Sequence, residues 1–209
     1  MASLQKLLGK EDRFFELFEG GAGAARDSVR VFAKFIQGRA ESRTLDDFVA
    51  VRRTEKAINS QISELLCTTF VSAMESEDVE ALAAALYKIP KTMEKIAERI
   101  QLAPHLLNGV DLSKQVTMLE RATETLLTMV QELRKGLAVP RVRQFNEQLQ
   151  AIEGDADKTV LELLRGLYTG QQEAARVVFL KDLFELLEKV TDRCRDAGNI
   201  IVQIVLKST

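Results

Sequence analysis

Hydrophobic residues recur every three or four positions along most of the chain, a spacing that places them on one face of an α-helix. Residues 140–169 show this pattern plainly, with apolar side chains at Phe145, Leu149, Ile152, Ala156, Val160, Leu163 and Leu167. Capping residues, glycine or proline separate six such segments. We predict helices at residues 11–39, 44–73, 76–102, 111–136, 140–169 and 171–207. Gly20, Gly21 and Gly23 are expected to weaken or bend the first helix.

The predicted helices are long and their connections are short, so neighbouring helices are expected to run antiparallel and to bury their apolar faces together. The sequence therefore predicts an all-α bundle. When the sequence is shifted by 101 positions, its second and third segments align with its fifth and sixth without a gap. The identities are Ala50 with Ala151, Leu66 with Leu167, Leu82 with Leu183, Leu86 with Leu187, Lys88 with Lys189 and Ile100 with Ile201. We therefore expect two tandem three-helix halves, residues 1–105 and 106–209.

Composition limits the class of protein. The 209 residues are 46% hydrophobic and 29% charged, which is ordinary for a soluble globular chain. The formal net charge of -2 gives no positive field, so no nucleic-acid partner is expected. No stretch approaches the ~20 apolar residues of a membrane span, and the first residues lack the pattern of a signal peptide. We predict a cytoplasmic protein that is not itself transmembrane.

Residues that commonly carry catalysis are scarce. Cys67 and Cys194 lie far apart, in no metal-ligand spacing, and are expected to pack as small apolar groups. The single histidine, His105, lies beside Pro104 in a predicted loop and is expected at the surface. One histidine cannot build a catalytic triad or an imidazole metal site. We therefore predict that the protein is not an enzyme.

Carboxylates spaced four residues apart occur in the last two segments. Glu153 and Asp157 share one helix face, and Glu188 and Asp192 repeat the spacing in the next segment, followed by Asp196. Like charges at this spacing repel. If the two helices are antiparallel neighbours, the acidic pairs can face each other, and a bound cation would compensate them. In the alternative, the acids form a solvated face that nearby basic residues neutralise. These are Lys158, Lys189, Arg193 and Arg195.

Four stretches of the chain resemble the PhoU-like family, specifically its branch of phosphate transport regulators or accessory proteins of the phosphate transporter Pit. They are FFELFEGGA (14–22), LLCTTFVSAMESEDVEALAAAL (65–86), IEGDADKTVLELLRGLY (152–168) and LKDLFELLEKVTDRCRDAGNIIVQIVLK (180–207). The last stretch is the most specific. The resemblance implies two tandem three-helix bundles whose E-x-x-x-D motifs hold metal clusters. Carried over by position, the metal ligands of the second half would be Glu153, Asp157, Glu188, Asp192 and Asp196.

An all-oxygen ligand set suits Mg, Mn or Ca, and the resemblance adds Fe, so a divalent or trivalent metal ion is expected. The first half departs from the family pattern. Positions 101 residues before four of the acids hold Arg52, Lys56, Tyr87 and Lys91, so no metal ion is expected there. The basic residues would instead replace the metal's charge by pairing with acids, hold an anion such as phosphate, or form solvated surface. The residues concerned are Arg52, Arg53, Lys56, Lys88 and Lys91.

The resemblance implies a regulator of inorganic phosphate transport that acts by protein-protein contact. Its partner would be a membrane phosphate transporter of the Pit type or a regulator of that transporter, and a homo-oligomer is left open. The location would be the cytoplasm, including the inner face of the membrane.

Two alternatives stay open. One is a metal-free helical scaffold that docks through its amphipathic start, unless that start packs on its own bundle. The apolar residues of the start are Leu4, Leu7, Leu8, Phe14, Phe15 and Phe18. The other is a metal-dependent hydrolase, which is disfavoured because no histidine lies in a long helical segment and no phosphate-cradling group accompanies the acids.

Overall fold

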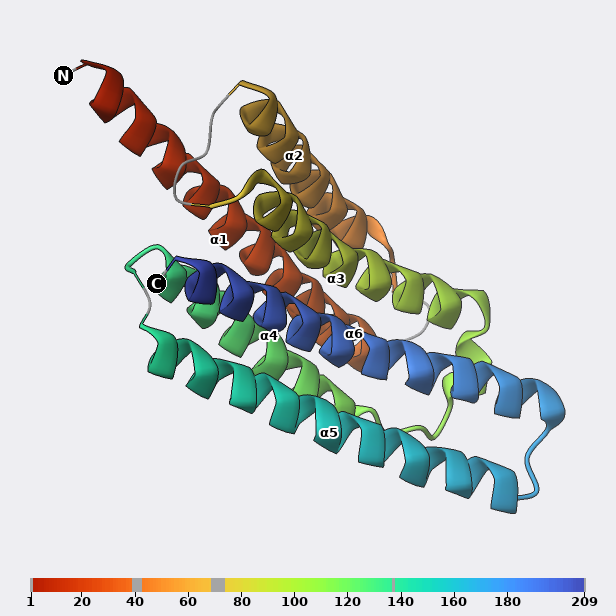
Figure 1. Cartoon of the computed structure of the whole chain (residues 1–209). Coiled ribbons are helices and arrows are strands. Elements are labelled where there is room, and N and C mark those ends of the chain that lie inside the picture. The colour runs from red at the N-terminus through yellow and green to blue at the C-terminus, as the bar shows by residue number, and fades with distance from the viewer. Residues whose placement is uncertain (1, 39–42, 69–73, 137, 209) are drawn as a thin grey trace.

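The chain folds into six long α-helices and one short 3-10 helix (Figure 1). The computed structural model describes residues 2–38, 43–68, 74–136 and 138–208, with the backbone alone for residues 2–11. The α-helices are α1 (Ala2–Gln37), α2 (Asp46–Thr68), α3 (Ser76–Leu102), α4 (Ser113–Leu133), α5 (Val139–Thr169) and α6 (Ala174–Lys207), and the 3-10 helix η2 is Pro104–Leu107. The prediction of an all-α bundle of six long helices is confirmed.

The helices form two groups of three. α1, α2 and α3 pack on one another, α4, α5 and α6 do the same, and the groups meet where α1 packs on α4 and α3 packs on α6. α2 and α5 therefore lie on opposite outer sides (Figure 1). One hydrophobic core runs through all six helices. The division of the chain into two halves, residues 1–105 and 106–209, stays a prediction.

Ion pairs at both ends of the contact show that α3 and α6 run antiparallel. Lys207, at the end of α6, binds Asp78 near the start of α3 at 3.0 Å. Arg99, near the end of α3, binds Asp182 near the start of α6 at 2.6 Å. The central contact between the two groups of helices therefore has a defined direction and register.

The first helix differs from its prediction. It begins at Ala2 instead of residue 11, and it continues through Gly20, Gly21 and Gly23 without interruption. A Cβ atom on Gly20 would lie 3.1 Å from Ile58 in α2, and one on Gly21 would lie 3.3 Å from Leu86 in α3. These glycines therefore let α2 and α3 approach α1 closely, and the helix does not break at them. The second predicted helix is helical over Asp46–Thr68, and its residues 69–73 lie outside the described part.

Several smaller predictions have clear outcomes. Phe14 and Phe18 are fully buried, so this part of α1 packs on its own bundle, whereas the side chains of Leu4, Leu7 and Leu8 lie outside the described residues. Cys194 is fully buried, and burial raises the pKa of its thiol to about 12. Cys67 is exposed, so the prediction that it packs as an apolar group is wrong.

His105 lies exposed on η2, as expected. None of the helices in the described ranges has the length and hydropathy needed to cross a membrane.

Candidate functional site

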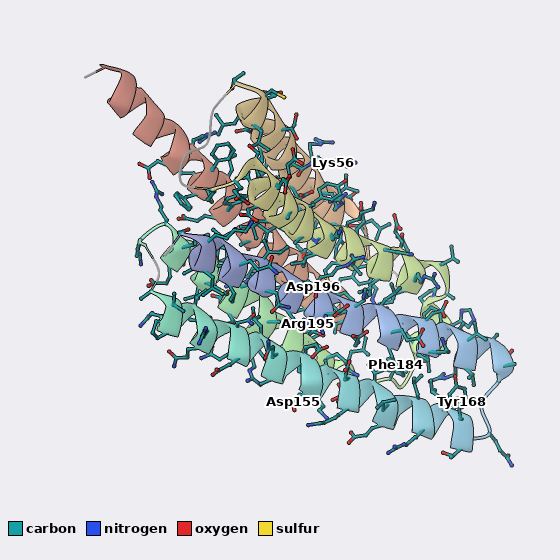
Figure 2. The ribbon with its side chains drawn as sticks, in the orientation of Figure 1. Lys56, Asp155, Tyr168, Phe184, Arg195 and Asp196 are labelled. Atoms are coloured by element: carbon teal, nitrogen blue, oxygen red, sulfur yellow. The ribbon has the colours of Figure 1, made fainter. Side chains whose placement is uncertain are left out.

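The acidic residues predicted as metal ligands gather where α5 and α6 run side by side. The connection between these helices is short, so they are antiparallel and the acidic faces meet. We call this group the second-half seam. It contains Glu153 and Asp157 from α5, and Glu188, Lys189, Asp192, Arg195 and Asp196 from α6. Asp155, on the same helix as Glu153, is exposed and points away to solvent (Figure 2).

Arg195 lies among three of the five predicted ligands. Its Nη1 donates to Oε1 of Glu153 across the helix interface, and its Nη2 donates to Oδ1 of Asp192 and, at 2.9 Å, to Oδ1 of Asp196. The other oxygen of Asp192 accepts a hydrogen bond from Nζ of Lys189. Hydrogen bonding to Asp196 and the surrounding negative charge raise the pKa of Arg195. One guanidinium group therefore ties α5 to α6.

Glu188 and Asp157 occupy the other end of the second-half seam. Burial and the negative charges of Asp192 and Asp157 together raise the pKa of Glu188 to about 7, with burial the largest cause. A carboxyl group with this pKa is partly protonated at neutral pH, which relieves the repulsion between the two acids. The E-x-x-x-D pairs of α5 and α6 thus do face each other, but their charge is already partly neutralised.

The seam in this conformation fits a guanidinium better than a metal ion. Oxygens of Glu153, Asp192 and Asp196 are taken by Arg195, and Asp192 also binds Lys189. Within residues 12–38, 43–68, 74–136 and 138–208, no three His, Cys, Asp or Glu side chains are grouped so that they could hold a metal ion. Metal binding at these acids stays a prediction, and it would require Arg195 to move.

A second polar cluster lies between α2 and α3, and we call it the first-half seam. Arg52 is 5% exposed at its centre. Its Nη1 donates to Glu55 at 2.8 Å, its Nε to Glu94 at 3.2 Å, and its Nη2 to the hydroxyl of Tyr87 at 2.9 Å. The guanidinium also lies over the Tyr87 ring, 4.5 Å from its centroid. All three nitrogens of Arg52 are therefore engaged by protein groups.

The other basic residues predicted for this region lie on its surface. Arg53, Lys56, Lys88 and Lys91 are exposed, and Lys91 reaches the ring of Tyr87 at 5.9 Å (Figure 2 shows Lys56). Arg52 is buried and each of its three nitrogens already donates to a protein group, so its guanidinium is not presented at the surface to an anion. Anion binding by the basic residues stays a prediction.

Glu55 and Glu94 are functional candidates that sequence reasoning missed. Glu55 is three residues from Arg52 on the same helix, a spacing at which opposite charges pair. Glu94 lies 101 residues before Arg195, so the register that aligns the two halves could have found it. Because Glu55 and Arg52 are both buried and paired, the first-half seam belongs to the packed interior and not to the solvated surface.

The buried Glu55 predicts a pH dependence of stability. Burial raises the pKa of Glu55 from 4.5 to about 7, although Arg52 acts in the opposite direction. A carboxyl pKa that is higher in the folded state stabilises the fold below the unfolded value, and this stabilisation is lost as the pH rises through the folded value. Between about pH 5 and pH 8, wild-type unfolding free energy should therefore fall more steeply than that of Glu55→Gln, as measured by urea unfolding.

The matched control is Glu64→Gln, which changes an exposed glutamate on the same helix. This variant should keep the wild-type pH dependence. Parallel curves for wild type and Glu55→Gln would contradict the assignment of the buried titration to Glu55.

One curated protein and two solved structures are similar to this chain over nearly its whole length. No protein-family model matches the chain. A protein of Rhizobium meliloti (strain 1021) named "Putative pit accessory protein" is 21% identical over 208 residues, which covers 98% of this chain and 97% of that protein.

Two solved structures from Shewanella oneidensis MR-1 share the fold, each with a TM-score of 0.74, covering 93% of this chain and 99% of theirs. One, at 20% identity, is described as a "putative PhoU-like phosphate regulatory protein", and the other, at 19%, as a PhoU-like protein. The resemblance predicted from the sequence is confirmed: the fold is that of PhoU-like proteins, and a named relative matches over nearly the whole chain.

Proposed function

We propose that the protein is an accessory or regulatory protein of inorganic phosphate transport that acts by contacting a Pit-type membrane transporter. The observation that carries this proposal is the similarity, along 98% of the chain, to a protein whose name contains "pit accessory protein". The shared PhoU-like fold supports the same class of function, because the solved relative is described as a phosphate regulatory protein. The proposed activity is binding and not catalysis.

One end of the bundle offers a surface for such a contact. The end of α3 and the turn between α5 and α6 lie at the same end of the molecule (Figure 1). Three large apolar side chains are exposed there: Leu102 at 88%, Tyr168 at 62% and Val178 at 62%. These exposed apolar side chains make this end of the bundle our candidate for the surface that contacts the transporter.

The proposal predicts direct binding to a transporter. The purified protein should bind the Pit-type transporter of its own organism when that transporter is held in lipid nanodiscs, and biolayer interferometry would measure the affinity. Leu102→Ser with Tyr168→Ser should weaken binding at least tenfold, which corresponds to about 1.4 kcal/mol. Leu206→Ser, which changes an exposed apolar residue at the opposite end of α6, should bind like wild type.

Phosphate uptake by cells gives the second measurement. Deleting the gene should change the rate of phosphate uptake through the Pit-type transporter. If the protein does not bind the transporter and uptake is the same with and without it, the proposed function is wrong. A metal ion is left out of the proposal because Arg195 already binds the carboxylates that would hold it.

A further inference from the structure

The two seams occupy equivalent places in the two halves. α2 ends at Thr68 and α5 ends at Thr169, 101 residues later, so the register that aligns the sequences also aligns these outer helices. At five positions in or beside the seams that this register relates, the charge has the opposite sign in the two halves. The pairs are Arg52 with Glu153, Lys56 with Asp157, Lys91 with Asp192, Glu94 with Arg195 and Lys95 with Asp196.

The contact across each seam joins the same two positions. In the first half, Nε of Arg52 on α2 binds Glu94 on α3 at 3.2 Å. In the second half, Glu153 on α5 accepts a hydrogen bond from Arg195 on α6. The arginine comes from the outer helix in one half and from the inner helix in the other, so the two positions of the pair are kept while their charges are exchanged.

Each seam needs a positive charge that stays in place. The side chains of Glu153 and Asp192 are only 17% and 11% exposed, and that of Glu55 is 3% exposed. Carboxylates withdrawn from water in this way are costly unless a cation pairs with them. A guanidinium group suits the task because its planar fork donates to several carboxylates at once and stays charged. Arg52 and Arg195 each bind carboxylates on two helices.

We infer that Arg195 is the resident cation of the second-half seam and Arg52 that of the first-half seam, so that the chain itself supplies the positive charge that the family resemblance assigns to metal. The packing of α5 on α6 then does not depend on the concentration of a metal ion. A partner that contacts this face meets acids whose charge Arg195 and Lys189 partly neutralise, whatever the metal concentration. The inference goes beyond the proposed function and does not rest on it.

Thermal unfolding with and without metal ions tests the inference. The melting temperature of wild type should change by less than about 1 °C with either a chelator or millimolar Mn²⁺. Arg195→Met should melt about 5 °C lower, because the acids lose their counter-charge, and Mn²⁺ should restore at least half of that loss. Arg193→Met is the control, because Arg193 donates to the backbone oxygen of Lys88 instead of a seam acid. It should show no response to Mn²⁺.

A conservative variant covers the case in which Arg195→Met does not fold. Arg195→Lys keeps one positive charge and should melt between wild type and Arg195→Met, without a response to Mn²⁺. The inference is overturned if chelation lowers the melting temperature of wild type, or if Mn²⁺ raises wild type or Arg195→Lys as much as Arg195→Met. Folded Arg195→Met that Mn²⁺ does not stabilise would also overturn it, because the acids would then form no cation site.

Discussion

Arg52→Met is expected to lower the free energy of unfolding by about 3–5 kcal/mol at pH 8, the largest effect of any single seam substitution. Arg52 is buried between Glu55 and Glu94, and its loss leaves Glu55 ionised in a site that is almost closed to water. Folded Arg52→Met can escape part of this cost by binding a proton at Glu55. The loss should therefore be smaller at about pH 5 than at pH 8, as measured by urea unfolding.

Two further variants distinguish the effect of the unpaired buried charge from nonspecific destabilisation. Arg53→Met, at the exposed neighbouring position, should change stability by less than about 0.5 kcal/mol. Arg52→Met combined with Glu55→Leu should regain most of the loss, because replacing both members of a buried ion pair removes the unpaired charge. If the double variant is no more stable than Arg52→Met, the cost does not come from Glu55.

Gly198→Ala is expected to destabilise the protein by about 1–3 kcal/mol, although alanine is the better helix former by about 1 kcal/mol. A Cβ atom at this position on α6 would lie 2.5 Å from Cδ1 of Leu149 and 3.0 Å from Oδ1 of Asn146, both on α5. Leu149 is 1% exposed, so its side chain cannot turn outward without losing its buried contacts. The substitution therefore pushes α5 away from α6 beside the second-half seam.

Gly166→Ala provides the matched control. Gly166 is also helical, on α5, but a Cβ atom there would meet no atom within 4 Å. This variant should gain about 0.5–1 kcal/mol from helix propensity alone. Equal effects of the two substitutions in thermal or urea unfolding would contradict the close approach of α5 and α6 at Gly198.

The helices were predictable because their signal is local. The apolar spacing of residues 140–169 identified the buried face of α5, and Leu149, Ile152 and Ala156 are indeed buried. The predicted helix began at residue 11, after Gly9, whereas α1 begins at Ala2. A helix tolerates a single glycine at a modest cost, so Gly9 does not end it. Gly198 gave no signal, because the need for a small residue arises only from the contact between α5 and α6.

The candidate site was predictable in part. Spacing alone indicated that Glu153, Asp157, Glu188 and Asp192 would meet if α5 and α6 were neighbours. It could not decide which cation would compensate them, because a metal ion and a nearby arginine satisfy the same pattern. That choice depends on the direction of the Arg195 side chain, which the structure places among the acids. The 101-residue register pairs Glu94 with Arg195, but the contact of Glu94 with Arg52 on another helix is visible only in the structure.

The most direct test of the account is anomalous diffraction from crystals of the wild-type protein grown with Mn²⁺. We expect no manganese peak in the second-half seam, with the guanidinium of Arg195 hydrogen-bonded to Glu153 and Asp192. A manganese ion bound by Glu153 and Asp192, with Arg195 turned away into solvent, would contradict it.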